Sequence, residues 1–181
     1  IENIENYFSY EPVPIACKYF YEDGTIINAP SNTNLLAKEL HEQLGEDENA
    51  VKAYLQQSSN IYENIGTVFL NFSLHKTATL FQSAIIKAIR KSKLRYLFTS
   101  MNSENKHFFK NEKTVQLFNR YATYNGSNPY KAPAMLTLIP DLEFNNGVFY
   151  PKGGMISITK ALYQLALKKG VQFHFNASVK K

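Results

Sequence analysis

The sequence predicts an α+β fold, a mixed sheet covered by amphipathic helices. Three observations lead to this prediction: aromatic and β-branched runs around an Asp-Gly turn, several stretches with helical periodicity, and an alternating segment near the C-terminal end. The chain has 181 residues, of which 44% are hydrophobic and 19% charged. This composition is sufficient to bury a core and excludes a disordered or collagen-like protein.

The N-terminal half predicts a hairpin followed by helices. Residues 18–29 place strand-forming residues on both sides of Asp23-Gly24, which predicts a two-residue turn. Leucines recur on one helical face over residues 36–44, and Gly45 suits a left-handed helix cap. Longer helices are then expected from about residue 46 and over 77–98, and neither contains a run apolar enough to span a membrane.

The C-terminal half predicts a helix and strands separated by turns. Residues 125–135 hold an Asn-Gly turn and two prolines and cannot form one helix. An extended run is expected over 148–151, a helix over 155–169 and a half-buried strand over 171–179. We expect the run at 148–151 to share one sheet with the hairpin.

Charge is unevenly distributed along the chain, whose net charge is +5. Residues 1–75 carry three lysines against eleven acids, residues 76–113 nine bases against two acids, and residues 114–181 eight against two. The asymmetry favours a partner that senses charge, although a solvated helix face is the simpler alternative. Only three of the twenty bases are arginine, the residue best suited to reading guanine, so nucleic acid is the least favoured partner.

Few residues carry recognisable chemistry by themselves. The sequence contains no G-x-G-x-x-G, no P-loop and no metal-ligand spacing among its histidines and Cys17. The single cysteine fits a reducing compartment such as the cytoplasm. Gly153-Gly154 precedes a predicted helix, and the pair serves either a tight turn or the close approach of a flat ligand to the backbone.

Two stretches together resemble a known family. They are residues 124–133, Tyr-Asn-Gly-Ser-Asn-Pro-Tyr-Lys-Ala-Pro, and residues 142–155, Leu-Glu-Phe-Asn-Asn-Gly-Val-Phe-Tyr-Pro-Lys-Gly-Gly-Met. The pattern resembles the FAD-dependent carotenoid desaturases, the phytoene desaturase-like family, specifically over 120–181 and loosely before. Because the family's two FAD motifs are absent, the resemblance implies the substrate-binding portion of a two-domain flavoenzyme. Residues 1–169 would form that portion, and 170–181 a strand returning toward the FAD-binding domain.

The resemblance implies an oxidoreductase that desaturates a carotenoid or similar polyene by hydride transfer to FAD, with the fragment inactive alone. Apolar contact must recognise such a hydrocarbon, and the many Phe and Tyr residues could line its cavity or simply form core. It further implies flavin contact by four contiguous residues, a cavity lined by three others, and one acid/base group, for which a structural ion pair is the favoured alternative. The residues expected to contact flavin are Lys152, Gly153, Gly154 and Met155. Those expected to line the cavity are Arg120, Tyr124 and Tyr150, and the acid/base group is Glu143.

Residues 77–98 also predict peripheral attachment to an anionic membrane, because they combine an apolar face with a basic end. Packing of that face into the core is an equal alternative. A stand-alone lipid-binding module without catalysis is the alternative function, and isomerases or ketolases of related sequence remain open. The bases expected to contact lipid are Lys87, Arg90, Lys91, Lys93 and Arg95.

Overall fold

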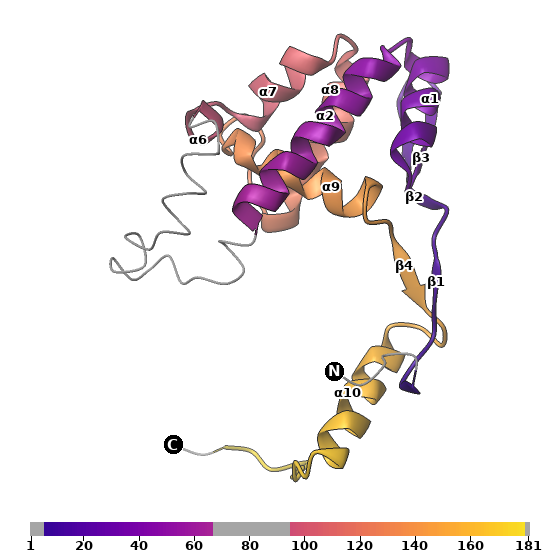
Figure 1. The fold of residues 1–181 in the computed structure, drawn as a ribbon, viewed down its shortest axis with the longest axis vertical. Helices are drawn as coiled ribbons and strands as arrows, with labels where there is room; N and C mark the ends of the chain where they lie inside the picture. The colour runs from indigo at the N-terminus through magenta and orange to yellow at the C-terminus, as the bar shows by residue number, and fades with distance from the viewer. Residues whose placement is uncertain (1–5, 67–94, 180–181) are drawn as a thin grey trace. The chain divides into compact units, whose positions relative to one another are not determined.

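The computed structural model describes residues 6–66 and 95–179. It contains two compact units, which are treated separately below (Figure 1). Unit 1 consists of Ile1–Val13 with Phe149–Lys181, and unit 2 of Pro14–Val148. The predicted domain boundary between residues 169 and 170 stays a prediction. Four of the five bases expected at the membrane, Lys87 to Lys93, lie outside the described residues.

Unit 1 holds two strands and one helix, and unit 2 a hairpin and a set of helices. The elements of unit 1 are β1 (Tyr10–Pro12), β4 (Phe149–Pro151) and α10 (Ile156–Lys168). Those of unit 2 are β2 (Ile15–Phe20), β3 (Ile26–Pro30), α1 (Thr33–Leu44), α2 (Glu48–Ile61), a π-helical turn (Tyr62–Gly66), α6 (Arg95–Phe98), α7 (Met101–Phe108), α8 (Glu112–Asn119), 3₁₀ turns (Arg120–Asn125 and Ala134–Leu138) and α9 (Ile139–Phe144).

The predicted hairpin is confirmed, with a different turn. β2 pairs antiparallel with β3, but the loop between the paired residues Tyr21 and Thr25 has three residues rather than two. The Gly24 N–H donates to the Tyr21 carbonyl at 3.0 Å, and Gly24 has φ 84°. A left-handed glycine after a tight turn is the usual three-residue hairpin solution, which an Asp-Gly pair serves as well as a two-residue turn.

Helix α1 begins and ends where its sequence indicates. The Asn32 side chain accepts hydrogen bonds from the N–H groups of Asn34 and Leu35, and Gly45 closes the helix with φ 70°. For the next helix, the apolar periodicity from Val51 to Phe69 predicts about six turns, and residues 67–69 of that stretch lie outside the described residues. Helix α2 ends at Ile61, and the chain continues as the π-helical turn Tyr62–Gly66.

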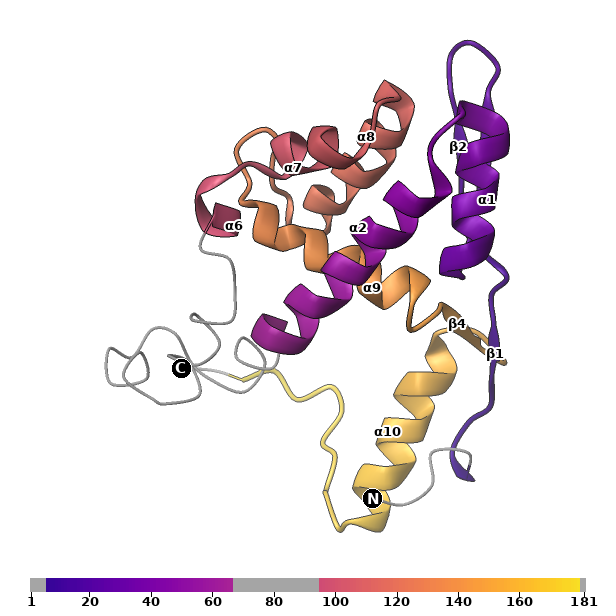
Figure 2. The ribbon, with the colours of Figure 1, turned by 45° about the horizontal axis from the view of Figure 1, so that its top comes forward.

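The core of unit 2 lies where α1, α2 and the hairpin meet α7, α8 and α9. α1 packs along the hairpin, and α2 crosses α9 in contact with it (Figure 2). The fully buried Tyr54 is central, with its ring centroid 4.9 Å from that of Phe109 and 4.6 Å from that of Phe118. Many of the aromatic residues therefore build core, one of the two roles expected for them.

Two expectations about strands are wrong. The hairpin and β4 do not share a sheet, because β4 pairs antiparallel with β1, while β2 and β3 form a separate antiparallel pair. Strand β1 was not expected from the sequence. Proline has no N–H to donate to a neighbouring strand, and prolines at the ends of these short strands limit further pairing.

Residues 171–179 also form no strand, and they pair with no strand in the part of the chain that the structure describes. Their alternating aromatic residues pack locally instead: the Phe173 ring lies 4.6 Å from the Tyr163 ring of α10, and Phe175 stacks on Phe173 at 6.0 Å. A turn at Phe175-Asn176, with Asn176 at φ 57°, interrupts the extended run. Whether this segment approaches an FAD-binding domain stays a prediction.

Within residues 6–66 and 95–179, no helix combines the length and the hydrophobicity needed to cross a bilayer.

Candidate functional site: an arginine cluster and a glycine turn

Unit 2 brings three of the predicted site residues together around one carboxylate. Glu143 lies on α9, and Arg120 begins the 3₁₀ turn that also carries Tyr124. The Arg120 Nη2 atom lies 3.3 Å from both Glu143 oxygens. Tyr121 donates its hydroxyl to Glu143 Oε1 at 2.8 Å, and Tyr124 donates to Oε2 at 3.2 Å. Both carboxylate oxygens therefore have partners from the same turn.

The guanidinium of Arg120 is held by the hairpin as well. Its Nε donates to the Tyr19 hydroxyl on β2 at 2.6 Å. Its central carbon lies 4.4 Å from the Tyr121 ring centroid, 5.5 Å from that of Tyr19 and 5.7 Å from that of Tyr124. Three aromatic faces and one carboxylate thus surround a single cation, which fixes the orientation of the guanidinium plane. We call Tyr19, Arg120, Tyr121, Tyr124 and Glu143 the arginine cluster.

Burial sets the protonation of the tyrosines in the arginine cluster. Burial raises the pKa of Tyr121 well above its ordinary value, and the neighbouring Glu143 carboxylate raises it further. Burial also raises the pKa of Tyr19, although the Arg120 charge opposes this. Both phenols stay protonated at neutral pH, so Tyr121 is a donor to the carboxylate and Tyr19 can accept from Arg120.

The predicted flavin contacts Lys152, Gly153, Gly154 and Met155 lie in unit 1 on the turn between β4 and α10, and Tyr150 lies on β4 itself. The Gly154 N–H donates to the Pro151 carbonyl at 3.0 Å, and Gly153 and Gly154 have φ 88° and 80°. The Gly154 carbonyl accepts from the Ser157 N–H at 3.0 Å and from the Ser157 hydroxyl at 2.7 Å. Two successive left-handed residues demand glycine here regardless of any ligand.

The surface beside this turn is open. A Cβ built on Gly153 would meet its first atom at 3.9 Å, and one on Gly154 would lie 3.6 Å from the Tyr150 hydroxyl. Tyr150 and Met155 are half or more exposed, and Lys152 is exposed. A flat ligand can therefore reach the backbone of both glycines, with an apolar side chain, a phenol and a cation beside it.

Sequence reasoning missed two members of the arginine cluster. Tyr121 adjoins Arg120 in the sequence and sits in an apolar periodic stretch, which indicated core and gave no sign of its hydrogen bond to Glu143. Tyr19 is 101 residues from its partner Arg120, and no local pattern links the two.

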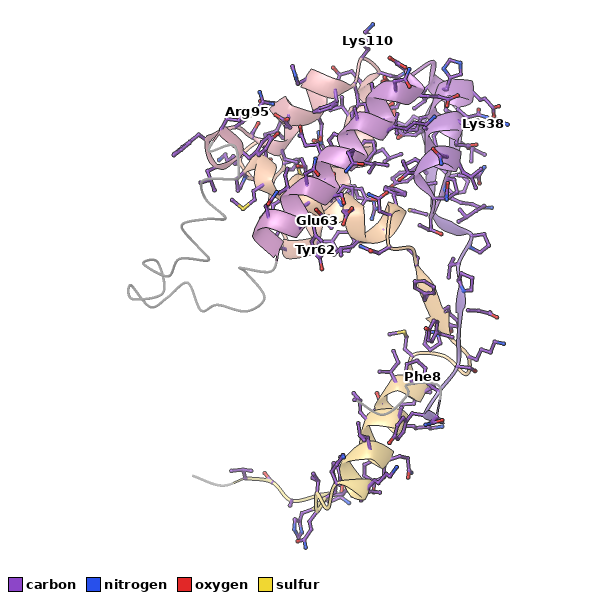
Figure 3. All side chains as sticks on the ribbon, viewed as in Figure 1. Phe8, Lys38, Tyr62, Glu63, Arg95 and Lys110 are labelled. Carbon is purple, nitrogen blue, oxygen red and sulfur yellow. The ribbon has the colours of Figure 1, made fainter. Side chains whose placement is uncertain are left out.

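Arg95 has a different environment from that expected of a lipid-facing base. It lies on α6 (Figure 3), and its Nη2 donates to both oxygens of Glu104 at 2.7 Å. The Glu104 side chain is only 2% exposed and also accepts from Gln57 at 2.9 Å. Arg95 thus neutralises a buried carboxylate.

Comparison with known proteins gives the family context. No protein-family model matches the chain. It is 44% identical to 1-hydroxycarotenoid 3,4-desaturase of Flavobacterium sp. over 179 residues, which cover 99% of this chain and 36% of that protein. The chain is homologous to the carotenoid desaturases. It is also 27% identical to 4,4'-diapolycopene oxygenase of Methylomonas sp and 27% identical to hydroxyneurosporene desaturase of Rhodobacter capsulatus, over 98% of this chain in each case.

These matches confirm the resemblance seen in the sequence and extend it over residues 1–119, where the motifs alone matched loosely. The chain spans 35 to 36% of the length of these three relatives.

Proposed function

We propose that this chain is the substrate-binding portion of an FAD-dependent carotenoid desaturase. The observation that carries the proposal is the 44% identity to 1-hydroxycarotenoid 3,4-desaturase over 99% of the chain. Because two of the relatives described above are named for hydroxylated carotenoids, a carotenoid with a hydroxyl group is the substrate class we favour. The reaction removes a hydride and a proton from adjacent carbons of the polyene and lengthens its conjugation.

Bound FAD would supply a two-electron acceptor for the hydride. The turn at residues 152–155 is where this chain would contact it. Gly153 and Gly154 present backbone without side chains, and the nearest atoms to a built Cβ lie at 3.6 and 3.9 Å. The exposed Lys152 offers a cation to a negatively charged group, and Met155 and Tyr150 offer surface to a ring. The residues present therefore fit a flavin.

For Glu143 we propose a positioning role instead of acid/base chemistry. Its side chain is 10% exposed, and its carboxylate is bound by Arg120, Tyr121 and Tyr124. A general base must reach the proton that it removes, and here the lone pairs of the carboxylate already accept from three residues. Glu143 holds Arg120 in place, and Arg120 with Tyr124 would form a polar part of the substrate cavity.

The flavin contact can be tested with two glycine substitutions in the intact protein. Gly154→Val forces a β-branched residue to φ 80° and puts its side chain at the proposed flavin contact. Gly170→Val is the matched control, because Gly170 has φ 84°, lies at the other end of α10 and has open space around it. Both variants carry similar backbone strain within unit 1.

We expect Gly154→Val to lose bound flavin and carotenoid turnover, while Gly170→Val keeps both. Visible flavin absorbance after gel filtration and the red shift of the carotenoid spectrum are the two measurements. Full flavin content and turnover in Gly154→Val would contradict the contact. If the wild type binds flavin but desaturates neither a hydroxylated nor an unmodified carotenoid, the proposed activity is wrong.

We further propose peripheral attachment to an anionic membrane through residues 87–93, on the cytoplasmic side. Each base near such a surface contributes about 1 kcal/mol. Arg95 is best left unchanged in the test, because its loss would strand the buried Glu104 carboxylate. Changing Lys87, Arg90, Lys91 and Lys93 to Gln should weaken co-sedimentation of the intact protein with anionic vesicles and reduce its salt dependence.

The control for this variant removes four exposed lysines elsewhere. Lys38 and Lys110 extend away from unit 2 (Figure 3), and Lys131 and Lys160 are also exposed. Changing these four to Gln should leave most of the vesicle binding. Equal loss in both variants would mean that general charge attraction, and not the stretch 87–93, brings the protein to the surface.

A further inference from the structure

A surface pocket of unit 2 lies beside the arginine cluster. It has a volume of about 530 Å³, and its lining includes Glu112, Lys113, Arg120, Thr123, Pro129 and Tyr130. These residues come from α8, from the 3₁₀ turn that follows it, and from the Asn-Pro-Tyr turn of the family motif. The Asn128 side chain fixes the last of these by accepting from the Tyr130 N–H at 2.9 Å.

The pocket offers no net charge to a ligand. Each of the three charged residues that line it is already ion-paired: Glu112 with Lys106 at 2.8 Å, Lys113 with Asp23, and Arg120 with Glu143 at 3.3 Å. The Lys113 amine also donates to the Thr25 hydroxyl at 2.8 Å. An anion entering the pocket would have to compete with these carboxylates, so a neutral ligand fits better.

Hydrogen-bonding capacity nevertheless remains. The bonds of Arg120 to Tyr19 and Glu143 use its Nε and Nη2 atoms, and a guanidinium carries five N–H donors, more than these bonds require. Thr123 donates its hydroxyl to the Arg120 carbonyl at 2.7 Å, which leaves the Thr123 oxygen free to accept. One neutral hydroxyl group could therefore accept from Arg120 and donate to Thr123 at the same time.

The rest of the lining combines three amide side chains, those of Asn102, Gln116 and Asn119, with an apolar part. Pro129 contributes aliphatic surface to this apolar part, and Tyr130, which also lines the pocket, is 67% exposed. A ring left exposed to this degree has a face available for a flat, apolar chain. The pocket thus joins a donor–acceptor pair to an apolar wall.

We propose that this pocket binds the hydroxyl-bearing end of the carotenoid, with Arg120 as donor and Thr123 as acceptor. The proposal rests on the proposed function, because it takes the ligand to be a hydroxylated polyene. It assigns to these two residues the discrimination between a hydroxylated carotenoid and its unmodified counterpart. A site built around a substrate hydroxyl disfavours the analogue that lacks it, since its polar groups are then left unpaired.

The test is a binding measurement on the intact, flavin-loaded protein with two carotenoids of the same carbon skeleton. One carries a terminal hydroxyl group and the other does not, and each Kd is obtained from quenching of tyrosine fluorescence. The wild type should bind the hydroxylated carotenoid at least about fivefold more tightly, the ratio expected of one net hydrogen bond. Thr123→Val should lower this preference, because only the bond from Arg120 then remains, and Thr123→Ser, which keeps the hydroxyl, should retain it in full.

A second variant probes the apolar wall without touching the polar pair. Tyr130→Ala removes an exposed ring and should weaken binding of both carotenoids by a similar factor. Equal affinity of the wild type for the two carotenoids, a full preference in Thr123→Val, or unchanged binding of both by Tyr130→Ala would each overturn the proposal.

Turnover of the same two carotenoids separates this proposal from the proposed function. Selective binding without desaturation would refute the activity and leave the pocket assignment standing. Desaturation without selective binding would refute the pocket assignment alone.

Discussion

Removing the hydroxyl of Tyr121 should destabilise the protein far more than removing that of Tyr124. Both phenols donate to the same carboxylate, at 2.8 and 3.2 Å, but Tyr121 is fully buried and Tyr124 is 61% exposed. A hydrogen bond to a charged group stabilises by about 1.5–3 kcal/mol, and this range applies where water cannot replace the donor. Tyr121→Phe should therefore cost about 2 kcal/mol.

The packing of the ring adds little to that figure, because phenylalanine keeps the contacts of the Tyr121 ring with Phe144 at 6.2 Å and with Phe118 at 6.3 Å. In Tyr124→Phe, water can supply the lost donor, so the expected cost is roughly 0.5 kcal/mol or less. The two variants share acceptor, chemistry and 3₁₀ turn, and burial is what separates them.

Urea denaturation of the intact protein, followed by circular dichroism, measures the difference. With a slope of roughly 2 kcal/mol/M, Tyr121→Phe should lower the midpoint by about 1 M, and Tyr124→Phe by a quarter of that or less. Equal midpoints for the two variants, or a larger shift for Tyr124→Phe, would refute the argument that burial makes the Tyr121 hydrogen bond the stronger one.

Two further predictions follow from buried polar groups. Burial raises the pKa of Tyr19 and Tyr121, so both phenols stay protonated above pH 10 in the folded protein. Their contribution to the free energy of unfolding is therefore present below pH 10 and falls as the pH rises further. Ultraviolet titration of the folded protein should show a late phenolate step that vanishes in urea. In thermal denaturation, Glu104→Gln should lower the stability by about 1–3 kcal/mol, because Glu104 is buried and bound twice by Arg95. The control Glu112→Gln should cost less than about 0.5 kcal/mol, because the Glu112 side chain is 77% exposed. Equal losses of stability in Glu104→Gln and Glu112→Gln would contradict the cost expected for the buried carboxylate.

Local signals in the sequence predicted the elements well. The hairpin, the capped helix α1, the turn at residues 125–135 and the helix after the glycine pair all follow from turn chemistry, caps and periodicity, which act over a few residues. Strand β1 could not be predicted in this way, because it pairs with β4, about 140 residues further along the chain. Tyr10 lies opposite Pro151, and Pro12 lies opposite Phe149, so this pairing depends on the folded chain. Residues 171–179 alternate as a strand should, but alternation specifies a face and not a partner, so it could not distinguish pairing from packing on Tyr163.

The candidate site divides in the same way. The turn at Gly153-Gly154 could be recognised in the sequence, because positive φ angles strongly favour glycine. The structure has both glycines at positive φ. Arg120, Tyr124 and Glu143 were found by family resemblance, which named them without their contacts. The contact that completes the cluster, from Tyr19, comes from the hairpin and needed the fold.

The geometry of Arg120 explains why a lysine could not replace it. One planar group donates from Nε to β2, donates from Nη2 to α9, and lies 4.4 Å from the centroid of the Tyr121 ring. A lysine amine would keep the charge but has neither the fork nor the flat face, so at most one of the two hydrogen bonds would survive with good geometry. The hairpin, the 3₁₀ turn and α9 would then lose their shared anchor beside the pocket. Arg120→Lys should consequently resemble Tyr121→Phe in stability and Thr123→Val in carotenoid preference, a combined effect that charge alone would not produce.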